Sequence, residues 1–162
     1  MKKGISILLS TIAGAAISGA AGYVFFDKKS KEVDREFECA NKNAAIINVM
    51  GEWIEQIQAG KSIVSYFEKN NYHRIAIYGM HYIGQRMLKE LQDSSVEVVY
   101  AIDRRGANIK ENIPVYSLQP GLEDVDAIIV TPIYYFNEIE DELEEFFDCP
   151  IISFEEILYD ER

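Results

Sequence analysis

The sequence predicts an α/β fold, a single small Rossmann-like parallel sheet of strand order 3-2-1-4-5 that is preceded by a transmembrane helix and a long linker helix. Three observations predict it. Short apolar runs, such as 75–78 and 127–130, are typical of parallel strands that are buried on both faces. Helical segments or loops separate these runs, and right-handed connections between them produce this strand order. The third observation is an uncharged stretch at 4–26, which a region of good helix formers follows.

The length of 162 residues suits one ordinary domain with an appendage. We expect a transmembrane anchor at 1–26, a helical linker at 27–60 and a Rossmann-like domain at 61–162. The formal net charge is −11, and residues 121–162 contain fourteen acidic residues and one basic residue. An acidic surface of this kind repels nucleic acid, so we expect no nucleic-acid partner.

Cysteines and histidines are too few and too scattered for a metal site. Cys39 and Cys149 are the only cysteines, and His73 and His81 are the only histidines. They form no CxxC or HxxxH spacing, so we expect neither a metal centre nor a disulfide framework.

The uncharged stretch 4–26 is long enough, as a helix, to cross about 30 Å of hydrocarbon. Lysines flank it, two before and three after: Lys2, Lys3, Lys28, Lys29 and Lys31. Because basic residues are enriched on the cytoplasmic side, we expect a single-pass protein of the cell membrane with a cytoplasmic globular domain. The alternative is a signal peptide that is cleaved at the small residues 18–20.

Two apolar stripes run along the predicted linker helix. The first has the spacing of a coiled-coil seam: Val33, Phe37, Ala40, Ala44, Ile47, Gly51 and Ile54. The second lies beside it: Ile46, Met50, Trp53 and Ile57. Such a helix can pair with a copy of itself, which would give a homo-oligomer, or fold back onto its own domain. The sequence leaves both arrangements open.

The first strand leads into a glycine turn. Gly60 is expected to end the linker helix, and Ser62 to cap a short helix at 63–69. The strand at 74–78 follows, and the chain then turns at Gly79 into a helix. This order is the opening of a βαβ unit.

Gly79 and Gly84 occupy two of the three glycine positions of the dinucleotide fingerprint G-x-G-x-x-G, and His81 occupies the other. An imidazole at that position crowds a pyrophosphate, although the N–H groups at the start of the helix still attract an anion. The turn therefore predicts the fold more strongly than it predicts the cofactor. The alternative is that both glycines serve only the backbone geometry.

Candidate ligand-binding residues gather at the ends of the strands. The second strand, 96–102, ends at Asp103, about 20 residues beyond the turn, where an acid holds the ribose in this architecture. Arg104 and Arg105 follow and could contact a phosphate, although an Asp-Arg pair is also ordinary turn chemistry. The fourth strand, 126–131, ends where ligands usually bind. The candidates are Gly79, Met80, His81, Gly84, Asp103, Arg104 and Thr131.

The remaining elements complete the sheet. A short edge strand is expected at 113–116, and either a turn of helix or a loop, rather than a long helix, connects it to the fourth strand. The loop that follows contains Tyr134, Tyr135 and Phe136, which either stack on a base or sugar or cover the sheet edge. An acidic helix starts at Asn137, and its buried side is expected to hold Ile139, Leu143, Phe146 and Phe147. The fifth strand lies at 150–153, and the last helix, 154–159, begins with a capping box of Ser153 and Glu156.

The chain resembles the small Rossmann-like domains of bacterial surface-glycan pathways, of the capsule and amino-sugar kind. The residues that carry the resemblance are the strand and turn 75–84, the strand end 100–103, and the segments 113–116 and 126–130. The similarity covers 62–162. It implies a pocket for a nucleotide-sugar or cofactor, either NAD(P) or a UDP-sugar, at Gly79, Met80, His81 and Asp103. It also implies a role in polysaccharide biosynthesis beside enzymes that carry a catalytic domain of their own.

Three functions remain open. The first is a membrane-anchored, non-catalytic module that binds a nucleotide or nucleotide-sugar, or that holds glycan-biosynthesis enzymes at the membrane. The second is an NAD(P)-dependent nucleotide-sugar epimerase or dehydratase, for which the sequence lacks the expected Tyr-x-x-x-Lys pair. The third is a structural homo-oligomer built on the linker helix. We assign no catalytic residue, because no nucleophile and base stand at a suggestive spacing.

Overall fold

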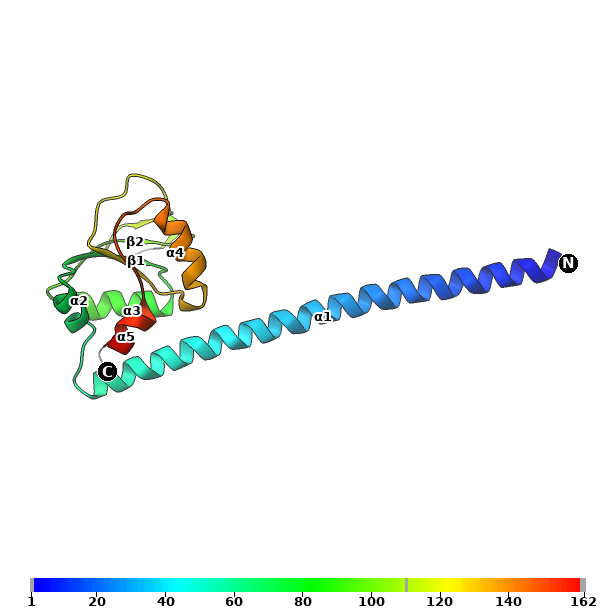
Figure 1. Ribbon diagram of the computed structural model, residues 1–162, viewed down its shortest axis with the longest axis horizontal. Helices are drawn as coiled ribbons and strands as arrows, with labels where there is room; N and C mark the ends of the chain where they lie inside the picture. The colour runs from blue at the N-terminus through cyan, green and yellow to red at the C-terminus, as the bar shows by residue number, and fades with distance from the viewer. Residues whose placement is uncertain (1, 110, 161–162) are drawn as a thin grey trace. The chain divides into compact units, whose positions relative to one another are not determined.

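A computed structural model describes the backbone of residues 2–109 and 111–160, and the side chains from residue 28 onward except that of residue 107. The chain divides into two compact units, Met1–Ala44 and Ala45–Arg162. Helix α1 (Lys2–Gln58) runs through the first unit and into the second (Figure 1). This confirms the predicted long helix, which ends where Gly60 adopts a φ of +76°. After that residue the N–H of Lys61 donates to the carbonyl of Gln56 over 2.9 Å.

The predicted membrane anchor lies outside the described side chains. The structure describes no side chain between residues 1 and 27, so the transmembrane segment and the alternative cleavage at 18–20 both stay predictions. Within the part of the chain that the structure describes, no helix is both long and apolar enough to span a membrane.

Part of the second stripe of α1, and not the coiled-coil seam, packs in the second unit. There Trp53 is buried, with Ile46 and Met50 packed beside it, whereas Ile57 of the same stripe is exposed. Val49, which belongs to neither predicted stripe, is buried as well. Ile47, a seam residue, is 68% exposed. In the first unit, all four seam residues are likewise exposed: Val33, Phe37, Ala40 and Ala44. Folding of the helix onto its own domain is thus shown for part of its length, and self-association along the seam stays a prediction.

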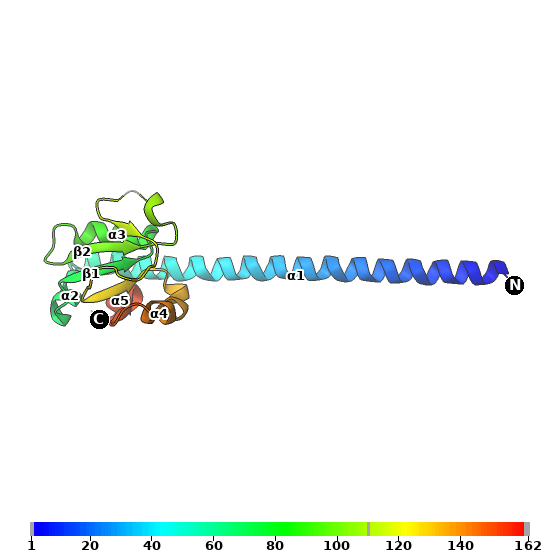
Figure 2. The same cartoon turned by 90° about the horizontal axis from the view of Figure 1, so that it is seen from above.

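The sheet has five parallel strands in the order β3-β2-β1-β4-β5, which confirms the predicted order 3-2-1-4-5. The strands are β1 (Arg74–Tyr78), β2 (Glu97–Ile102), β3 (Val115–Tyr116), β4 (Ala127–Val130) and β5 (Ile151–Ser153). Figure 2 shows β1 and β2 side by side in the middle of the sheet. Tyr78 lies opposite both Ile102 and Val130, so three strands end in register. The residues that follow these strands therefore meet at one edge of the sheet.

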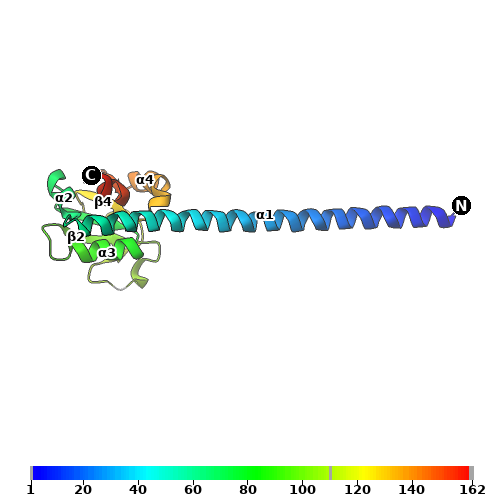
Figure 3. The same cartoon turned by 90° about the horizontal axis from the view of Figure 1, so that it is seen from below.

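One face of the sheet is covered by several helices of the second unit. They are the C-terminal part of α1, α2 (Val64–Asn70), α3 (Tyr82–Leu91) and α5 (Phe154–Asp160) (Figure 3). We call this the helical face. Its core contains Ile75 and Ile77 of β1 and Ile129 of β4, all fully buried. Alternate residues of each strand point to this face because side chains in a strand alternate with a period of two.

The other face is covered by α4 (Phe136–Glu144) and by loop side chains, and we call it the thin face. Tyr78, Tyr100 and Ile128 point to this face and pack with Ile139 and Leu143 of α4.

The prediction that Phe146 is buried was wrong. Its side chain is 42% exposed because α4 ends at Glu144, so Phe146 no longer follows the apolar stripe of the helix. Phe147 does pack partly against the thin-face core, as predicted.

The helix caps agree in part with the sequence. The hydroxyl oxygen of Ser62 accepts from the N–H of Val64 over 3.3 Å at the start of α2. At the start of α5, that of Ser153 accepts from the N–H of Glu155, also over 3.3 Å. The predicted capping box is not closed, because the carboxylate of Glu156 accepts from the hydroxyl of Tyr66 instead.

The connections on either side of β3 are short. Between β2 and β3 the described residues form only the 3-10 turn η1 (Gly106–Asn108). A loop, one of the two predicted connections, joins β3 to β4, and the 3-10 turn η2 (Ile133–Tyr135) joins β4 to α4.

Candidate functional site

The glycine turn between β1 and α3 is held by contacts that leave no room for a side chain. Gly79 has a φ of +92°, a conformation that only glycine adopts without strain. A Cβ atom on Gly79 would lie 2.7 Å from the ring of Pro132 and 2.9 Å from the hydroxyl oxygen of Thr131. A Cβ atom on Gly84 would overlap the carbonyl oxygen of Gly79. Both glycines are therefore required for the first turn of α3 to pack against the ends of β1 and β4.

Thr131, at the end of β4, fastens the turn from one side. Its hydroxyl donates to the carbonyl oxygen of Gly79 at 2.7 Å and lies 3.1 Å from that of Tyr78. Its backbone N–H donates to the same Tyr78 carbonyl over 3.0 Å. Thr131 thus satisfies backbone acceptors that the turn leaves without a ladder partner.

Asp103, at the end of β2, fastens the turn from the other side. One carboxylate oxygen accepts from the N–H of Met80 over 2.8 Å and from the Nη2 of Arg105 over 3.2 Å. The other accepts from the backbone N–H of Arg105 over 2.9 Å and from its Nε over 3.0 Å. The same guanidinium donates to the carbonyl of Met80 over 3.1 Å.

This network uses the full acceptor capacity of the Asp103 carboxylate. An ionised carboxylate has about four lone-pair sites, and Met80 and Arg105 fill as many. Burial alone would raise the pKa of Asp103, but the hydrogen bonds from Arg105 and from the N–H of Met80 outweigh it and lower the pKa. The carboxylate is therefore ionised at neutral pH and already occupied, so a ribose hydroxyl would have to displace one of its partners.

A cavity of about 380 Å³ opens beside the turn, at the carboxyl ends of β1, β2 and β4. Gly79, His81, Asp103 and Arg104 line it, together with residues between β4 and the first turn of α4: Pro132, Tyr135, Glu138 and Ile139. The volume lies within the range of small-molecule sites. Parallel α/β sheets bind ligands at this position, outside the carboxyl ends of the strands.

The lining offers a cation, an imidazole and a ring to a ligand. Arg104 is 81% exposed and lies 3.9 Å from a carboxylate oxygen of Glu142, at the limit of an ion pair. His81 is the exposed N-cap residue of α3, and it makes no side-chain hydrogen bond to the helix. Tyr135 is 38% exposed. The first N–H groups of a helix lack intrahelical partners, so α3 presents uncapped donors beside His81.

The structure brings the predicted site residues together in two layers. His81 and Arg104 face the cavity with Gly79 and part of Asp103, whereas Met80, Gly84 and Thr131 lie beneath and hold the turn. The sequence also suggested Arg105 for a phosphate, and the structure instead places its guanidinium on Asp103 and Met80. Four further residues that line the cavity were not predicted from the sequence as site residues: Tyr78, Pro132, Glu138 and Ile139. Pro132, Glu138 and Ile139 could have been predicted from their positions, since Pro132 follows the end of β4 and the other two lie in the first turn of α4.

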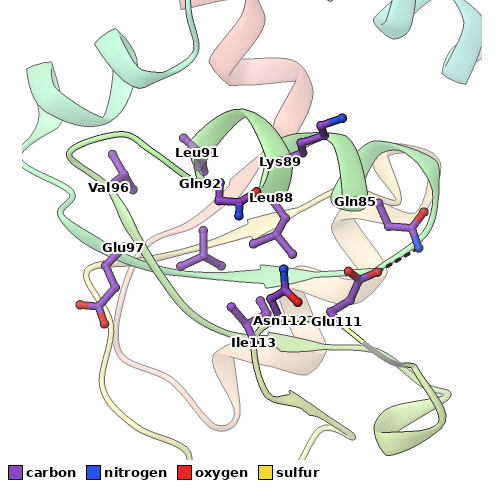
Figure 4. A pocket seen from close by; sticks show the side chains of 11 residues that line it. Gln85, Leu88, Lys89, Leu91, Gln92, Val96, Glu97, Glu111, Asn112 and Ile113 are labelled. Atoms are coloured by element: carbon purple, nitrogen blue, oxygen red, sulfur yellow. Dashed lines mark hydrogen bonds between the residues drawn. The ribbon is translucent and has the colours of Figure 1, made fainter.

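A second cavity, of about 450 Å³, lies on the helical face between α3, β2 and the segment before β3 (Figure 4). Its apolar lining includes Leu88, Val98 and Ile113, and the amide of Gln85 donates to the carboxylate of Glu111 over 3.1 Å. A crossover helix between β2 and β3 would ordinarily fill this space. Because only η1 is found there among the described residues, we attribute this cavity to the short connection.

Among the residues that the structure describes, no histidine, cysteine and carboxylate side chains form a group of three or more that could hold a metal ion. Comparisons of the chain with protein families, with curated proteins and with solved structures found no match.

Proposed function

We propose that this protein is a membrane-anchored, non-catalytic Rossmann-like module that binds a nucleotide or nucleotide-sugar in the cavity beside Gly79. The observation that carries the proposal is the meeting of Arg104, His81 and the uncapped start of α3 at one cavity of about 380 Å³. A guanidinium and free backbone N–H groups are the donors that bind phosphate. Tyr135 adds an aromatic ring on which a base or sugar can stack.

The state of Asp103 favours phosphate recognition over the dinucleotide mode. In that mode the acid after the second strand binds the ribose, and a glycine at the second fingerprint position lets the pyrophosphate approach. Here the Asp103 carboxylate is filled by Arg105 and Met80, and His81 stands at the glycine position. These features support a ligand that is held through its phosphate by Arg104 and α3, and they do not support an NAD(P)-dependent epimerase or dehydratase.

The test is a thermal-shift measurement on the full chain in detergent micelles. The compounds are UMP, UDP, UDP-N-acetylglucosamine, NAD and coenzyme A. A ligand at a hundred times its dissociation constant stabilises the folded state by about 2.7 kcal/mol. We expect a shift with the uridine nucleotides that the variant Arg104→Ala loses, because the exposed Arg104 guanidinium provides the phosphate contact.

The matched control is Arg35→Ala, which removes an exposed cation from α1. It should keep the ligand-dependent shift. Absence of a shift with every compound, or a shift that survives both Arg104→Ala and His81→Ala, would contradict the proposal.

The anchor is part of the same proposal and is supported by the uncharged stretch 4–26 with its flanking lysines. We expect the chain to stay with the membrane after alkaline carbonate extraction. We also expect Lys28 not to react with a membrane-impermeant amine reagent added outside the cell, because the proposed orientation places this lysine in the cytoplasm. A mature chain that begins just after residues 18–20 would show a cleaved signal peptide instead.

A further inference from the structure

A groove of about 520 Å³ runs along the second-unit part of α1 where α3 lies beside it. The lining from α1 consists of Met50, Trp53, Ile54 and Ile57. Ile54 and Ile57 are 49% and 53% exposed, although both are large aliphatic residues. Exposed apolar surface that gathers in a groove, rather than as single side chains, marks a binding surface.

The floor of this groove has the spacing of a helix-packing ridge. Residues 50, 53, 54 and 57 stand at i, i+3, i+4 and i+7, so they form one continuous stripe along α1. The aromatic ring of Trp53 is fixed from below. Its Nε1 donates to Glu90 over 2.8 Å, and its ring centroid lies 4.6 Å from that of Phe154. The floor is therefore a formed apolar surface between two helices, which is the shape that accepts a third helix.

The rim of the groove is cationic. Arg86 and Lys89 come from α3, and Lys61 follows the end of α1. The guanidinium of Arg86 contacts neutral groups, the carbonyl oxygen of Tyr82 at 3.4 Å and the ring of Tyr82 at 5.8 Å. Among the described residues, no carboxylate pairs with Arg86 or Lys89 within salt-bridge distance.

Glu90, the only acid in the lining, does not neutralise this rim. One carboxylate oxygen accepts from Trp53, and the other accepts from the hydroxyl of Ser62 over 2.9 Å and from the N–H of Ile63 over 3.2 Å. These neutral donors hold the carboxylate toward the inner side of the groove, and its single charge stands against three basic residues in the lining. A positive rim on a chain of net charge −11 is a local exception, and such a rim attracts an acidic partner.

We propose that this groove binds an amphipathic helix of another protein, one whose apolar stripe is flanked by aspartate or glutamate. The stripe would rest on Met50, Ile54 and Ile57, and the carboxylates would face Arg86 and Lys89. This site is separate from the cavity beside Gly79, and it gives the module a means to hold a partner protein.

The charge pattern favours a foreign helix over a second copy of this chain. A two-fold pair through this groove would place the same patch against itself, so the cations Arg86 and Lys89 of both copies would face each other. Like charges across an interface are unfavourable, and the net charge of −11 on each copy adds to the repulsion. An acidic helix avoids the first of these penalties, because its carboxylates face Arg86 and Lys89.

The test uses the full chain in detergent micelles and two fluorescein-labelled helical peptides. Both peptides carry the same leucine stripe, which is flanked by glutamates in one and by lysines in the other. Fluorescence anisotropy gives their dissociation constants. We expect the glutamate peptide to bind at least about tenfold more tightly than the lysine peptide. Only the glutamate peptide can form charge pairs with Arg86 and Lys89. The double variant Arg86→Glu, Lys89→Glu should reverse this preference.

Ile54→Asp combined with Ile57→Asp should weaken the glutamate peptide by about tenfold or more, because both apolar contacts are lost. These positions are exposed, so the fold is kept, and circular dichroism checks this. Matched controls stand elsewhere on the chain. Arg35→Glu reverses an exposed cation, and Phe146→Asp replaces an exposed apolar side chain. Both controls should bind the glutamate peptide like the wild type.

Equal affinity for the two peptides would overturn the proposal, and so would binding that the groove variants leave unchanged. Failure of both peptides to bind would also overturn it. Self-association of the wild type that Ile54→Asp abolishes would overturn it in favour of a second copy as the occupant.

Discussion

The two faces of the sheet are covered very differently. The helical face is packed by four helices, whose contributions include the fully buried Phe67, Met87 and Phe154. The thin face has one helix, α4, together with loop residues that are only partly buried. Both faces use the same strands, so the strands do not decide this asymmetry. It follows from which connections are helical.

Because the two faces are covered differently, one face stabilises the domain and the other leaves the cavity open to a ligand. Burial of large apolar side chains is the main favourable term in folding, and most of it lies on the helical face. The cavity beside Gly79 opens next to Tyr78 and Ile139, both of which belong to the thin-face core. The sparse cover therefore leaves room for a ligand while the helical face keeps the domain folded. Substitutions on the two faces can test this division.

The largest effect is expected where α3 meets the sheet. Gly84→Ala would place a Cβ atom on the carbonyl oxygen of Gly79, so the backbone at Gly79 or at Gly84 must shift. We expect a loss of about 4 kcal/mol in the free energy of unfolding, measured by chemical denaturation. Gly51→Ala is the matched control, because no atom lies within 4 Å of its added Cβ. In an exposed helix that control should gain about 0.5–1 kcal/mol. Similar losses in both variants would refute the close packing of the turn.

A pair of truncations compares the two faces directly. Trp53→Ala removes a ring of the helical face that packs on Phe154 and donates to Glu90, so we expect it to cost about 4 kcal/mol. Leu143→Ala, on the thin face, should cost about 2.5 kcal/mol, because the loops around it can close in on the space.

Phe146→Ala is the control for this pair. Its ring is 42% exposed, and its loss should change stability by less than about 1 kcal/mol. A thin-face truncation that costs more than Trp53→Ala would reverse the proposed division of stability.

Asp103 links the turn to the cavity, and its removal should be measurable as a function of pH. Asp103→Asn weakens the bonds to Arg105 and Met80 and should cost about 2 kcal/mol near neutral pH. The folded-state pKa of Asp103 lies below the ordinary value of 3.8. The stability that the carboxylate contributes is therefore full above that value and is lost as the pH falls through the folded-state pKa.

The measurement is the difference in free energy of unfolding between the wild type and Asp103→Asn across acid pH. It should shrink as the pH drops below 3.8. A difference that grows on acidification would show that the carboxylate is not stabilised in the folded state.

The smallest effect is expected at Tyr100, on the thin face. Its hydroxyl donates to the carbonyl of Glu123 over 2.9 Å, so Tyr100→Phe should cost about 1 kcal/mol. Burial, with smaller contributions from nearby anionic groups, raises the pKa of Tyr100 to about 12 from the ordinary 10.0.

Because the pKa of Tyr100 is raised in the folded state, the free energy of unfolding should depend on pH in the alkaline range. The neutral phenol is favoured in the folded state, so its contribution is full below pH 10 and is lost as the pH rises toward 12. Stability of the wild type should fall more steeply over this interval than that of Tyr100→Phe. Parallel curves would contradict a buried, neutral Tyr100.

Local pattern was sufficient for most of the fold. The five strands and their order follow from apolar runs and connection lengths, and β1 has the predicted bounds at 74–78. A buried parallel strand must be apolar on both faces, and that requirement can be read without knowing its neighbours. The glycine turn could be placed for the same reason, because positive φ at Gly79 depends on the local backbone.

The sequence pattern does not show which of several residues far apart in the chain will contact a given group. The sequence shows two stripes on α1, and only packing with the domain decided that Trp53 is buried and Ile47 is exposed. It places Asp103 after β2, but whether this carboxylate is free for a ribose depends on Arg105 and on the N–H of Met80 across the turn.

The order of the residues is thus sufficient to predict the helices and strands, their arrangement in the sheet and the edge of the sheet where a ligand would bind. Packing of the folded domain determines which face of α1 is buried, which acceptors are already filled and which cations stay unpaired. The physical reason is that secondary structure depends on the local apolar period, whereas each of these outcomes depends on groups brought together only by folding.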